Sequence, residues 1–195
     1  MLVIGISGPK FSGKDTLARL IIEEGCDSRP IRTFAFAYAL KAGCRVVFEL
    51  SHEQVHGAVE VKEATDPRWD KSPRELMQLF GTEVGRAIDQ NVWVKSVGAQ
   101  VKKWVESLPV ADQDTALAII TDTRFINEAK WVKDRGGVVV KVYRDSSYTG
   151  FREDHASETE MWEIREDIAV HNNGTLEDLR SHAREVLASL EELRG

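Results

Sequence analysis

A glycine-rich segment near the N-terminus has the residue types and the spacing of a phosphate-binding loop. Residues 8–16 read GPKFSGKDT, so that Gly8 is followed after four residues by Gly13 and Lys14. Glycines at these places let backbone N–H groups converge on phosphate oxygens, and the lysine reaches the terminal phosphates as a point charge. An apolar run (LVIGIS) precedes the segment and a helix-like stretch (LARLIIEE) follows it. This strand–loop–helix setting predicts that the chain binds a nucleoside triphosphate.

The residue after the lysine departs from the common form of the loop. Asp15 stands where a serine or threonine usually donates its hydroxyl to magnesium, and a hydroxyl follows at Thr16. Another acid, Asp122, closes the apolar run ALAIIT. In phosphate-loop proteins an acid in that place holds Mg²⁺ directly or through water. Arg124, two residues further, projects to the same side if the extended geometry continues.

Residues 72–89 (SPRELMQLFGTEVGRAID) predict a helix whose start is fixed by its own side chains. Ser72 and Glu75 form a capping box, and Pro73 occupies the first helical position. The face that can pack is apolar and comprises Leu76, Met77, Phe80, Val84, Ala87 and Ile88.

The other face of this predicted helix mixes polar groups with glycines, and comprises Arg74, Gln78, Gly81, Thr82, Gly85 and Asp89. A glycine costs about 1 kcal/mol in a helix interior, which suggests that something approaches the backbone closely. Arg86 and the downstream Trp93 can extend this face, Arg86 to bind an anion and Trp93 to provide a ring for stacking. The alternative interpretation is a solvated face with helix-breaking glycines.

The surrounding elements predict an α/β fold. Apolar, β-branched runs recur at about 2–6, 31–36, 116–121, 138–143 and 167–171. Helical patterns separate them, which predicts a largely parallel five-stranded sheet covered on both faces. The last of these patterns is an amphipathic helix with Thr175 as its N-cap and with Glu177 and Asp178 in its first turn.

Two regions stand apart from this alternation. From about 37 to 108 the pattern is helical and more polar, which predicts an insertion into a core of about 1–36 and 109–195. From 145 to about 162 the sequence is polar, charged and glycine-containing. Such long loops in compact domains are usually functional or disordered. Because this one follows a strand ending in Arg144, we expect a lid over the phosphates.

Length and composition narrow the classes of function. The 195 residues suit one domain, and the formal net charge of -6 argues against a general binder of nucleic acids or membrane surfaces. Cys26 and Cys44 have no metal-type or redox spacing, so both are predicted to be buried thiols. No basic leader or bilayer-length apolar stretch is present, and a cytoplasmic location is the default expectation.

Seven segments, taken in order, resemble the deoxynucleoside monophosphate kinases of tailed phages. They are FAFAYALK, SPRELMQLFGTEVGR, NVWVK, TDTRFINEA, GGVVVKVYR, DHASE and HNNGTLEDL. The resemblance covers essentially the whole chain. It implies a P-loop kinase fold with a helical substrate-binding insertion and a lid, which uses ATP and Mg²⁺ to phosphorylate a deoxynucleoside monophosphate. Tyr38 stands where this family often has an acid, so a sugar or base contact there is in doubt.

The resemblance also implies roles for individual residues. For ATP these are Gly8, Lys10, Ser12, Gly13, Lys14, Asp15, Thr16 and, near the adenine, Asn172, Asn173 and Gly174. For magnesium they are Asp15, Thr16 and Asp122. For the acceptor they are Lys41, Arg74, Gln78, Arg86, Asp89, Trp93, Arg124 and Glu158. For catalysis they are Lys14, Asp15, Arg124, Arg144 and Arg152.

Other functions share parts of this pattern. Phosphomevalonate kinase is similar in its loop and its acidic Ser-Glu motif, and dephospho-coenzyme A kinase is a more distant alternative. A non-catalytic ATP-binding switch is the alternative from another class, although the joint presence of Lys14, Asp122 and the arginines of the expected lid favours a transferase. The expected partners are ATP and the acceptor nucleotide, with no nucleic acid or membrane, and a homodimer is the commonest closed assembly.

Overall fold

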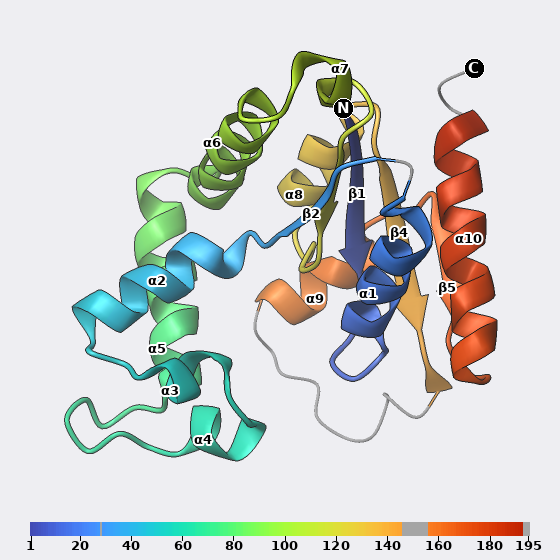
Figure 1. The fold of residues 1–195 in the computed structure, drawn as a ribbon. Helices are drawn as coiled ribbons and strands as arrows, with labels where there is room; N and C mark the ends of the chain where they lie inside the picture. The colour runs from blue at the N-terminus through green and yellow to red at the C-terminus, as the bar shows by residue number, and fades with distance from the viewer. Residues whose placement is uncertain (28, 146–155, 193–195) are drawn as a thin grey trace. The chain divides into compact units, whose positions relative to one another are not determined.

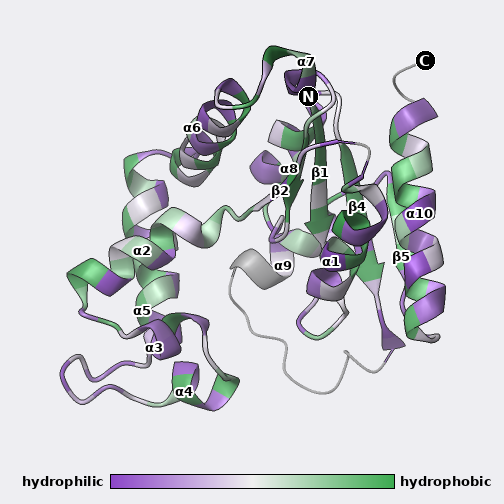
Figure 2. Cartoon of the chain, in the orientation of Figure 1, coloured by the Kyte–Doolittle hydropathy of each residue, from purple (hydrophilic) through white to green (hydrophobic). Residues whose placement is uncertain are grey.

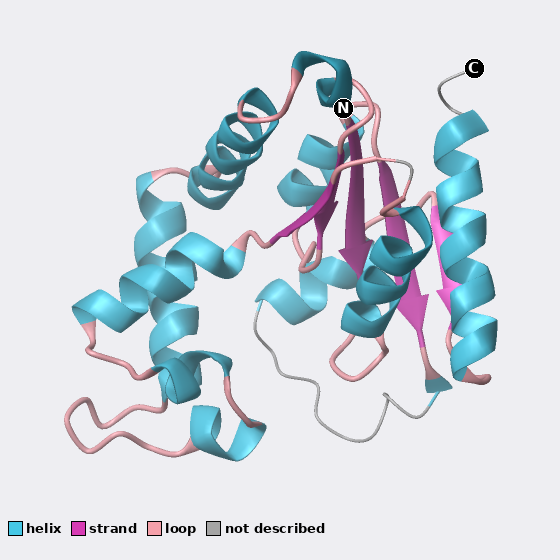
Figure 3. Cartoon of the chain, viewed as in Figure 1, coloured by secondary structure: helices cyan, strands magenta, loops and turns pink. Residues whose placement is uncertain are grey.

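The computed structural model describes residues 1–27, 29–145 and 156–192, with the side chains of 156–158 left out. The chain packs as two compact units (Figure 3). We call residues 1–35 and 99–195 the sheet unit and residues 36–98 the helical unit. Each is described by itself below. No helix of the described residues is long and apolar enough to cross a membrane.

The sheet unit alternates strands with helices, as the sequence predicts. Its elements are β1 (Leu2–Ser7), α1 (Lys14–Gly25), β2 (Ile31–Phe34), α7 (Val110–Gln113), β3 (Leu117–Ile120), α8 (Ile126–Lys133), β4 (Val138–Tyr143), α9 (Ala156–Glu163), β5 (Ile168–His171) and α10 (Leu176–Glu192). Helix α6 (Val92–Glu106) begins in the helical unit and ends in the sheet unit.

The five strands form one parallel sheet in the order β2-β3-β1-β4-β5. The predicted five-stranded α/β architecture is therefore confirmed. Because the strands are parallel, their carboxyl ends lie along one edge of the sheet. Residue pairs near this edge are Ser7 with Lys141 and Tyr143 with His171. Open α/β sheets bind their ligands beyond this edge, so the loops that follow these strands are the ones that matter for function.

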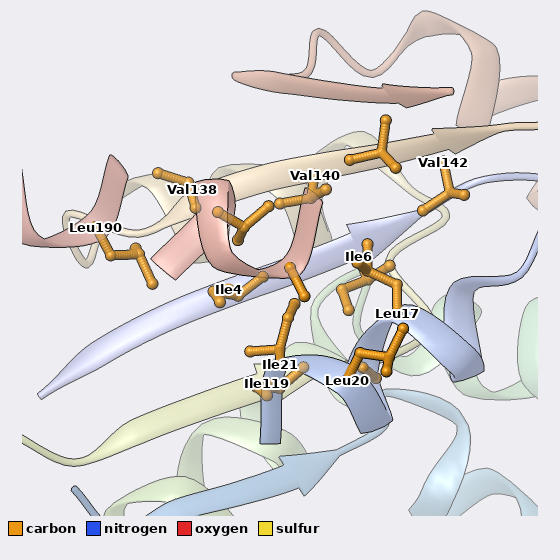
Figure 4. Packing of buried hydrophobic residues seen from close by; sticks show 14 of the residues in the cluster. Ile4, Ile6, Leu17, Leu20, Ile21, Ile119, Val138, Val140, Val142 and Leu190 are labelled. Atoms are coloured by element: carbon orange, nitrogen blue, oxygen red, sulfur yellow. The ribbon is translucent and has the colours of Figure 1, made fainter. Parts of the chain in front are cut away.

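Alternate strand residues face opposite layers of helices. Ile4, Ile6 and Val140 point toward α1 and α10, where Leu17 and Leu190 complete a fully buried cluster (Figure 4). Figure 1 shows α1 and α10 on the same side of the sheet and α8 on the other. In Figure 2 the central strands are strongly hydrophobic, whereas α10 alternates between hydrophobic and hydrophilic residues. Strands buried on both faces carry such continuous apolar runs.

Helix α10 is fixed at its start and along its side. The Thr175 hydroxyl accepts a hydrogen bond from the Asp178 N–H at 3.2 Å, which confirms the predicted N-cap. Along the helix, the carboxylate of Glu24 on α1 accepts hydrogen bonds from Arg180 at 2.6 Å and from Arg184 at 2.8 Å. These contacts hold α10 beside α1, the helix that follows the glycine-rich loop.

The helical unit is built from α2 (Ala37–Val47), α3 (His52–His56), α4 (Val59–Glu63), α5 (Pro73–Leu79), the π-helix η1 (Phe80–Arg86) and the first half of α6. All its residues are described, and none lies in a strand, as the helical pattern predicts. Its core is the cluster of Cys44, Leu50, Val55 and Leu76, flanked by the edge-to-face pair of Phe48 and Phe80.

The predicted helix over 72–89 is continuous, but its second half is not α-helical. The Ser72–Glu75 capping box is confirmed, with Pro73 in the first turn. The predicted packing of Val84, Ala87 and Ile88 is wrong, because all three residues are exposed, Val84 to 47% and Ile88 to 79%. A π-helical turn holds more residues than an α-helical turn. Residues after Phe80 are therefore rotated away from the face that an α-helical wheel predicts.

The two cysteines differ in their surroundings. Cys44 is fully buried, and burial raises the pKa of its thiol to about 11. Cys26, also predicted to be buried, is exposed. It follows the last turn of α1, and its N–H donates to the carbonyl of Ile22.

We expect one fast-reacting thiol in the folded protein and two in the unfolded protein. The thiolate is the reactive form of cysteine, and Cys44 stays protonated and covered at pH 8. A chromogenic disulfide reagent, used with and without urea, counts the thiols. The variant Cys26→Ser should lose the fast reaction entirely. Two fast thiols without urea would contradict the packing of the helical unit.

Candidate functional site

The glycine-rich loop connects the end of β1 to the start of α1 at the carboxyl edge of the sheet. Gly8 has a φ of 138° and Gly13 a φ of 99°, in the region that side-chain-bearing residues rarely adopt. A Cβ atom on Gly8 would lie 2.5 Å from the carbonyl oxygen of Val142 at the end of β4. Both glycines of the predicted motif are thus required by the backbone of this loop, and Gly8 also by its contact with the sheet.

The loop turns its polar groups inward. The ammonium group of Lys14 donates to the carbonyl of Pro9 at 2.7 Å, across the loop. The hydroxyl of Ser12 is fully buried and has no hydrogen-bond partner among the described residues. A buried hydroxyl without a partner costs free energy. A phosphate group fits such a loop, because its oxygens accept from hydroxyl, ammonium and backbone N–H donors.

The residues predicted around magnesium lie on two elements of the sheet unit. Asp15 is exposed in the first turn of α1, and Thr16 is half-buried beside it. Asp122 is half-buried just after β3. The described residues contain no group of three or more His, Cys, Asp or Glu side chains that could hold a metal ion. Carboxylate and hydroxyl oxygens are the kind of donor that Mg²⁺ prefers, so the side chains of Asp15, Thr16 and Asp122 fit this ion by their chemistry.

A buried carboxylate shapes the turn that carries Asp122 and Arg124. Glu128 is 3% exposed, and its Oε2 accepts from the N–H of Arg124 at 2.9 Å and of Phe125 at 3.1 Å. The Glu160 carboxylate of α9 accepts from the N–H of Ile126 at 3.1 Å. The backbone N–H groups at the start of α8 thereby find acceptors in two carboxylates, those of Glu128 and Glu160. Sequence reasoning missed both glutamates, although Glu128 has the N3 spacing of a capping box.

A buried lysine ties α9 to the sheet. Lys141 of β4 is 2% exposed, and its ammonium group donates to the carbonyl of Ile164 at 2.9 Å and lies 3.7 Å from the Glu166 carboxylate. Burial lowers the pKa of Lys141, and the charge of Glu166 opposes that shift. The lysine thus fixes the chain where α9 ends, which positions Glu160 against α8.

The loop after β5 contacts both the glycine-rich loop and the residues that follow β4. Arg144 is exposed directly after β4. The Asn172 amide donates to the carbonyl of Ser12 at 2.8 Å. The Asn173 amide donates to the carboxylate of Asp145 at 2.9 Å and accepts from the Asp145 N–H at 3.0 Å. Both predicted adenine-side asparagines therefore make contacts within the protein.

In the helical unit, the predicted acceptor-binding residues Lys41, Arg74 and Gln78 are all half-buried. The guanidinium of Arg74 on α5 lies 3.2 Å from the carboxylate of Glu63 on α4. The planar fork of N–H donors on arginine pairs bidentately with carboxylates and with phosphates, so the same guanidinium suits a phosphate monoester.

Two other predicted acceptor residues, Arg86 and Asp89, make contacts within the helical unit. Arg86 is 7% exposed and donates to the carbonyl of Gln90 at 3.2 Å. Asp89 accepts from the N–H of Asn91 and pairs with Lys95, which lowers the pKa of its carboxyl. The contacts described for these two residues stabilise the turn that connects η1 to α6.

The glycines of η1 make room for protein side chains. A Cβ atom on Gly81 would lie 2.9 Å from Leu40, and one on Gly85 would lie under 3.0 Å from the ring of Trp93. The Trp93 indole N–H donates to the Gly81 carbonyl at 2.9 Å. The close approach to the helix backbone, indicated by the glycines, is thus made by Leu40 and Trp93.

Two predicted site residues are not described by the structure. Arg152, assigned to catalysis, lies outside the described residues, and so does most of the predicted lid. The side chain of Glu158, assigned to the acceptor, is likewise not described. Their assignments stay predictions.

Comparisons with known proteins identify a matching family and several relatives of this chain. A family model described as deoxynucleotide monophosphate kinase matches residues 49–183. A protein of Acanthamoeba polyphaga mimivirus, provisionally named as such a kinase, is 34% identical over 187 residues, 93% of each chain. The deoxynucleotide monophosphate kinase of Escherichia phage RB69 is 30% identical over 60% of this chain and 45% of its own. The deoxynucleoside-5'-monophosphate kinase of Escherichia phage T5 is 24% identical over 81% of this chain and 84% of its own.

We expect Glu128→Ala to destabilise the sheet unit by about 1–3 kcal/mol, because it removes the acceptor of two backbone N–H groups in a buried turn. Urea denaturation measures the free energy of unfolding. Lys130→Ala on the same helix removes only an exposed ion pair with Asp134, and its effect should stay within about 0.5 kcal/mol. Equal effects of the two variants would show that the Glu128 contacts are not important for stability.

Proposed function

The chain belongs to the deoxynucleotide monophosphate kinase family, and we propose that it transfers the γ-phosphoryl group of ATP to a deoxynucleoside monophosphate. The products are a deoxynucleoside diphosphate and ADP. The observation that supports this most directly is the glycine-rich loop, in which Gly8 and Gly13 adopt left-handed backbone geometry at the carboxyl edge of a parallel sheet. The sheet unit would bind ATP, and the helical unit would bind the acceptor.

In the proposed ATP site, backbone N–H groups of the loop and the start of α1 receive the phosphates, and Lys14 carries a positive charge to them. Lys14 follows Gly13 directly as the first residue of α1. Arg124 and Arg144 follow the ends of β3 and β4, so both arginines leave the same edge of the sheet as the loop. Their charges would stabilise the negative charge that is shared among the phosphoryl oxygens during transfer.

Magnesium is part of the proposal. Asp122 and Thr16 are the residues that would hold it, with Asp15 in the position that usually carries a hydroxyl. The ion would neutralise phosphate charge when bound. Asp15 is exposed in the first turn of α1, so its carboxylate is accessible to a water molecule or an ion in solution.

The transfer needs positioning and charge rather than a general base. A phosphate monoester has a second pKa of about 6, so the acceptor oxygen is already ionised near neutral pH. The proposed residues are accordingly lysines and arginines, and their task is to hold donor and acceptor in line. In the helical unit, Arg74 is the residue we propose to hold the acceptor phosphate, oriented by the Glu63 carboxylate at 3.2 Å.

The purified protein should form ADP from ATP and Mg²⁺ when a deoxynucleoside monophosphate is added. A coupled assay with the four common monophosphates, and with mevalonate 5-phosphate and dephospho-coenzyme A as alternative acceptors, measures the rate. No ADP with any of the monophosphates would contradict the proposal. ATP binding without turnover on any acceptor would favour a binding switch.

Asp15→Ala should lower the Mg²⁺-dependent rate by about 10–100-fold while ATP affinity changes much less, because the proposed role of Asp15 concerns the ion. Initial rates across a Mg²⁺ series, with ATP binding measured separately, distinguish the two effects. Arg19→Ala, which removes an exposed ion pair with Glu23 on the same helix, is the matched control. Unchanged turnover in Asp15→Ala would remove Asp15 from the site.

Arg74→Ala should raise the KM for the acceptor by about 10–100-fold and leave the KM for ATP nearly unchanged, because a hydrogen bond to a charged group contributes about 1.5–3 kcal/mol. Steady-state kinetics with each substrate varied in turn measures this. Arg45→Ala changes an exposed arginine of the same unit and should behave like the wild type. A rise in the KM for ATP alone would contradict the division between the two units.

A further inference from the structure

The residue after β5 makes contacts with both the neighbouring strand and the glycine-rich loop. The N–H of Asn172 donates to the carbonyl of Tyr143 at 2.7 Å, which continues the pairing of β4 with β5. The rings of Tyr143 and His171 stack beside this bond, with centroids 5.3 Å apart. The backbone of Asn172 is therefore held by the sheet, and its side chain starts from a fixed place.

The side chain of Asn172 crosses from that place to the loop. Its amide nitrogen donates to the Ser12 carbonyl at 2.8 Å, over a sequence separation of 160 residues. Only the donor end of a carboxamide can pair with a carbonyl, so the orientation of this amide follows from its partner. A Cβ atom on Gly13 would collide with the same nitrogen. Gly13 is thus needed both for its φ of 99° and for the approach of Asn172.

This hydrogen bond fixes the plane of one peptide group in the loop. The described residues contain no cis peptide bond, and in a trans peptide the C=O and the following N–H point in opposite directions. With the Ser12 carbonyl turned toward Asn172, the N–H of Gly13 must point away from Asn172. In phosphate-binding loops the backbone N–H groups are the donors to phosphate oxygens.

We propose that Asn172 is a positioning residue for the triphosphate, which acts by holding the Ser12–Gly13 peptide so that the Gly13 N–H faces the phosphates. The inference rests on the proposed ATP site and assigns Asn172 a role that differs from a contact with adenine. One N–H of the Asn172 amide is already engaged with the Ser12 carbonyl. The next residue, Asn173, uses both its amide nitrogen and its amide oxygen on Asp145.

Asn172→Ala removes the donor, and we expect it to weaken ATP binding by about tenfold, the value of one well-placed hydrogen bond. Isothermal titration calorimetry with ATP and no acceptor measures this. An ¹⁵N label on glycine adds a direct readout, since the Gly13 amide signal should lose its ATP-dependent shift in the variant. A general loss of stability would not single out that signal.

Asn172→Asp gives a second measurement that does not depend on the stability of the alanine variant. Near neutral pH its carboxylate cannot donate and faces the Ser12 carbonyl, so ATP binding should be weaker than in N172A. The protonated acid can donate again, which favours its neutral form and raises its pKa above the ordinary value of about 3.9. The ratio of variant to wild-type Kd should therefore fall from pH 8 to pH 5, whereas the ratio for N172A should stay flat.

Lys133→Ala is the matched control, because Lys133 also donates to a distant backbone carbonyl, that of Arg165, at 2.9 Å. It should leave ATP binding unchanged. Wild-type ATP affinity in folded N172A, or a pH-independent ratio for N172D, would overturn the positioning role. If the expected changes in ATP binding occur while the wild type phosphorylates no monophosphate, the acceptor assignment fails and the role of Asn172 stands.

Discussion

The contact of a glycine-rich loop with the ends of two parallel strands is the constraint on which the sheet unit depends. Gly8 lies against the Val142 carbonyl of β4, and Gly13 lies against the Asn172 amide after β5. A side chain at Gly8 would collide with the sheet and one at Gly13 with the Asn172 side chain, and either would strain the backbone. The loop is therefore rigid because it is packed, and a preorganised set of N–H donors loses little entropy when it binds phosphate.

The same edge of the sheet is held by side chains that satisfy backbone groups. Glu128 accepts from the turn after β3, Glu160 accepts from the start of α8, and Lys141 donates to the chain at the end of α9. Each is a charged group placed where it meets backbone donors or acceptors rather than an opposite charge alone. Such bonds fix direction as well as distance, so the residues carried by these turns leave the sheet in defined orientations.

Local signals explain what could be predicted from the sequence. The five strands, the capping box at Ser72 and the N-cap at Thr175 depend on residues close together in the chain, and the structure confirms them. The π-helix over Phe80–Arg86 depends on Leu40 and Trp93, which approach from other helices, so an α-helical wheel misplaced Val84 and Ile88. The contact of Asn172 with Ser12 spans 160 residues and leaves no local pattern.

Gly13 of the glycine-rich loop and Gly85 of η1 have the same physical role in different settings. Each admits a protein side chain to the backbone, Asn172 at Gly13 and Trp93 at Gly85, and that side chain donates a hydrogen bond to a nearby carbonyl. The donated bond then sets the orientation of a peptide group. Glycines such as Gly13 and Gly85 thus mark the places where a donor from elsewhere in the protein approaches the backbone. In the proposed ATP site, the triphosphate would meet the opposite side of the Ser12–Gly13 peptide, which Asn172 orients, so a residue without any ligand contact would influence affinity.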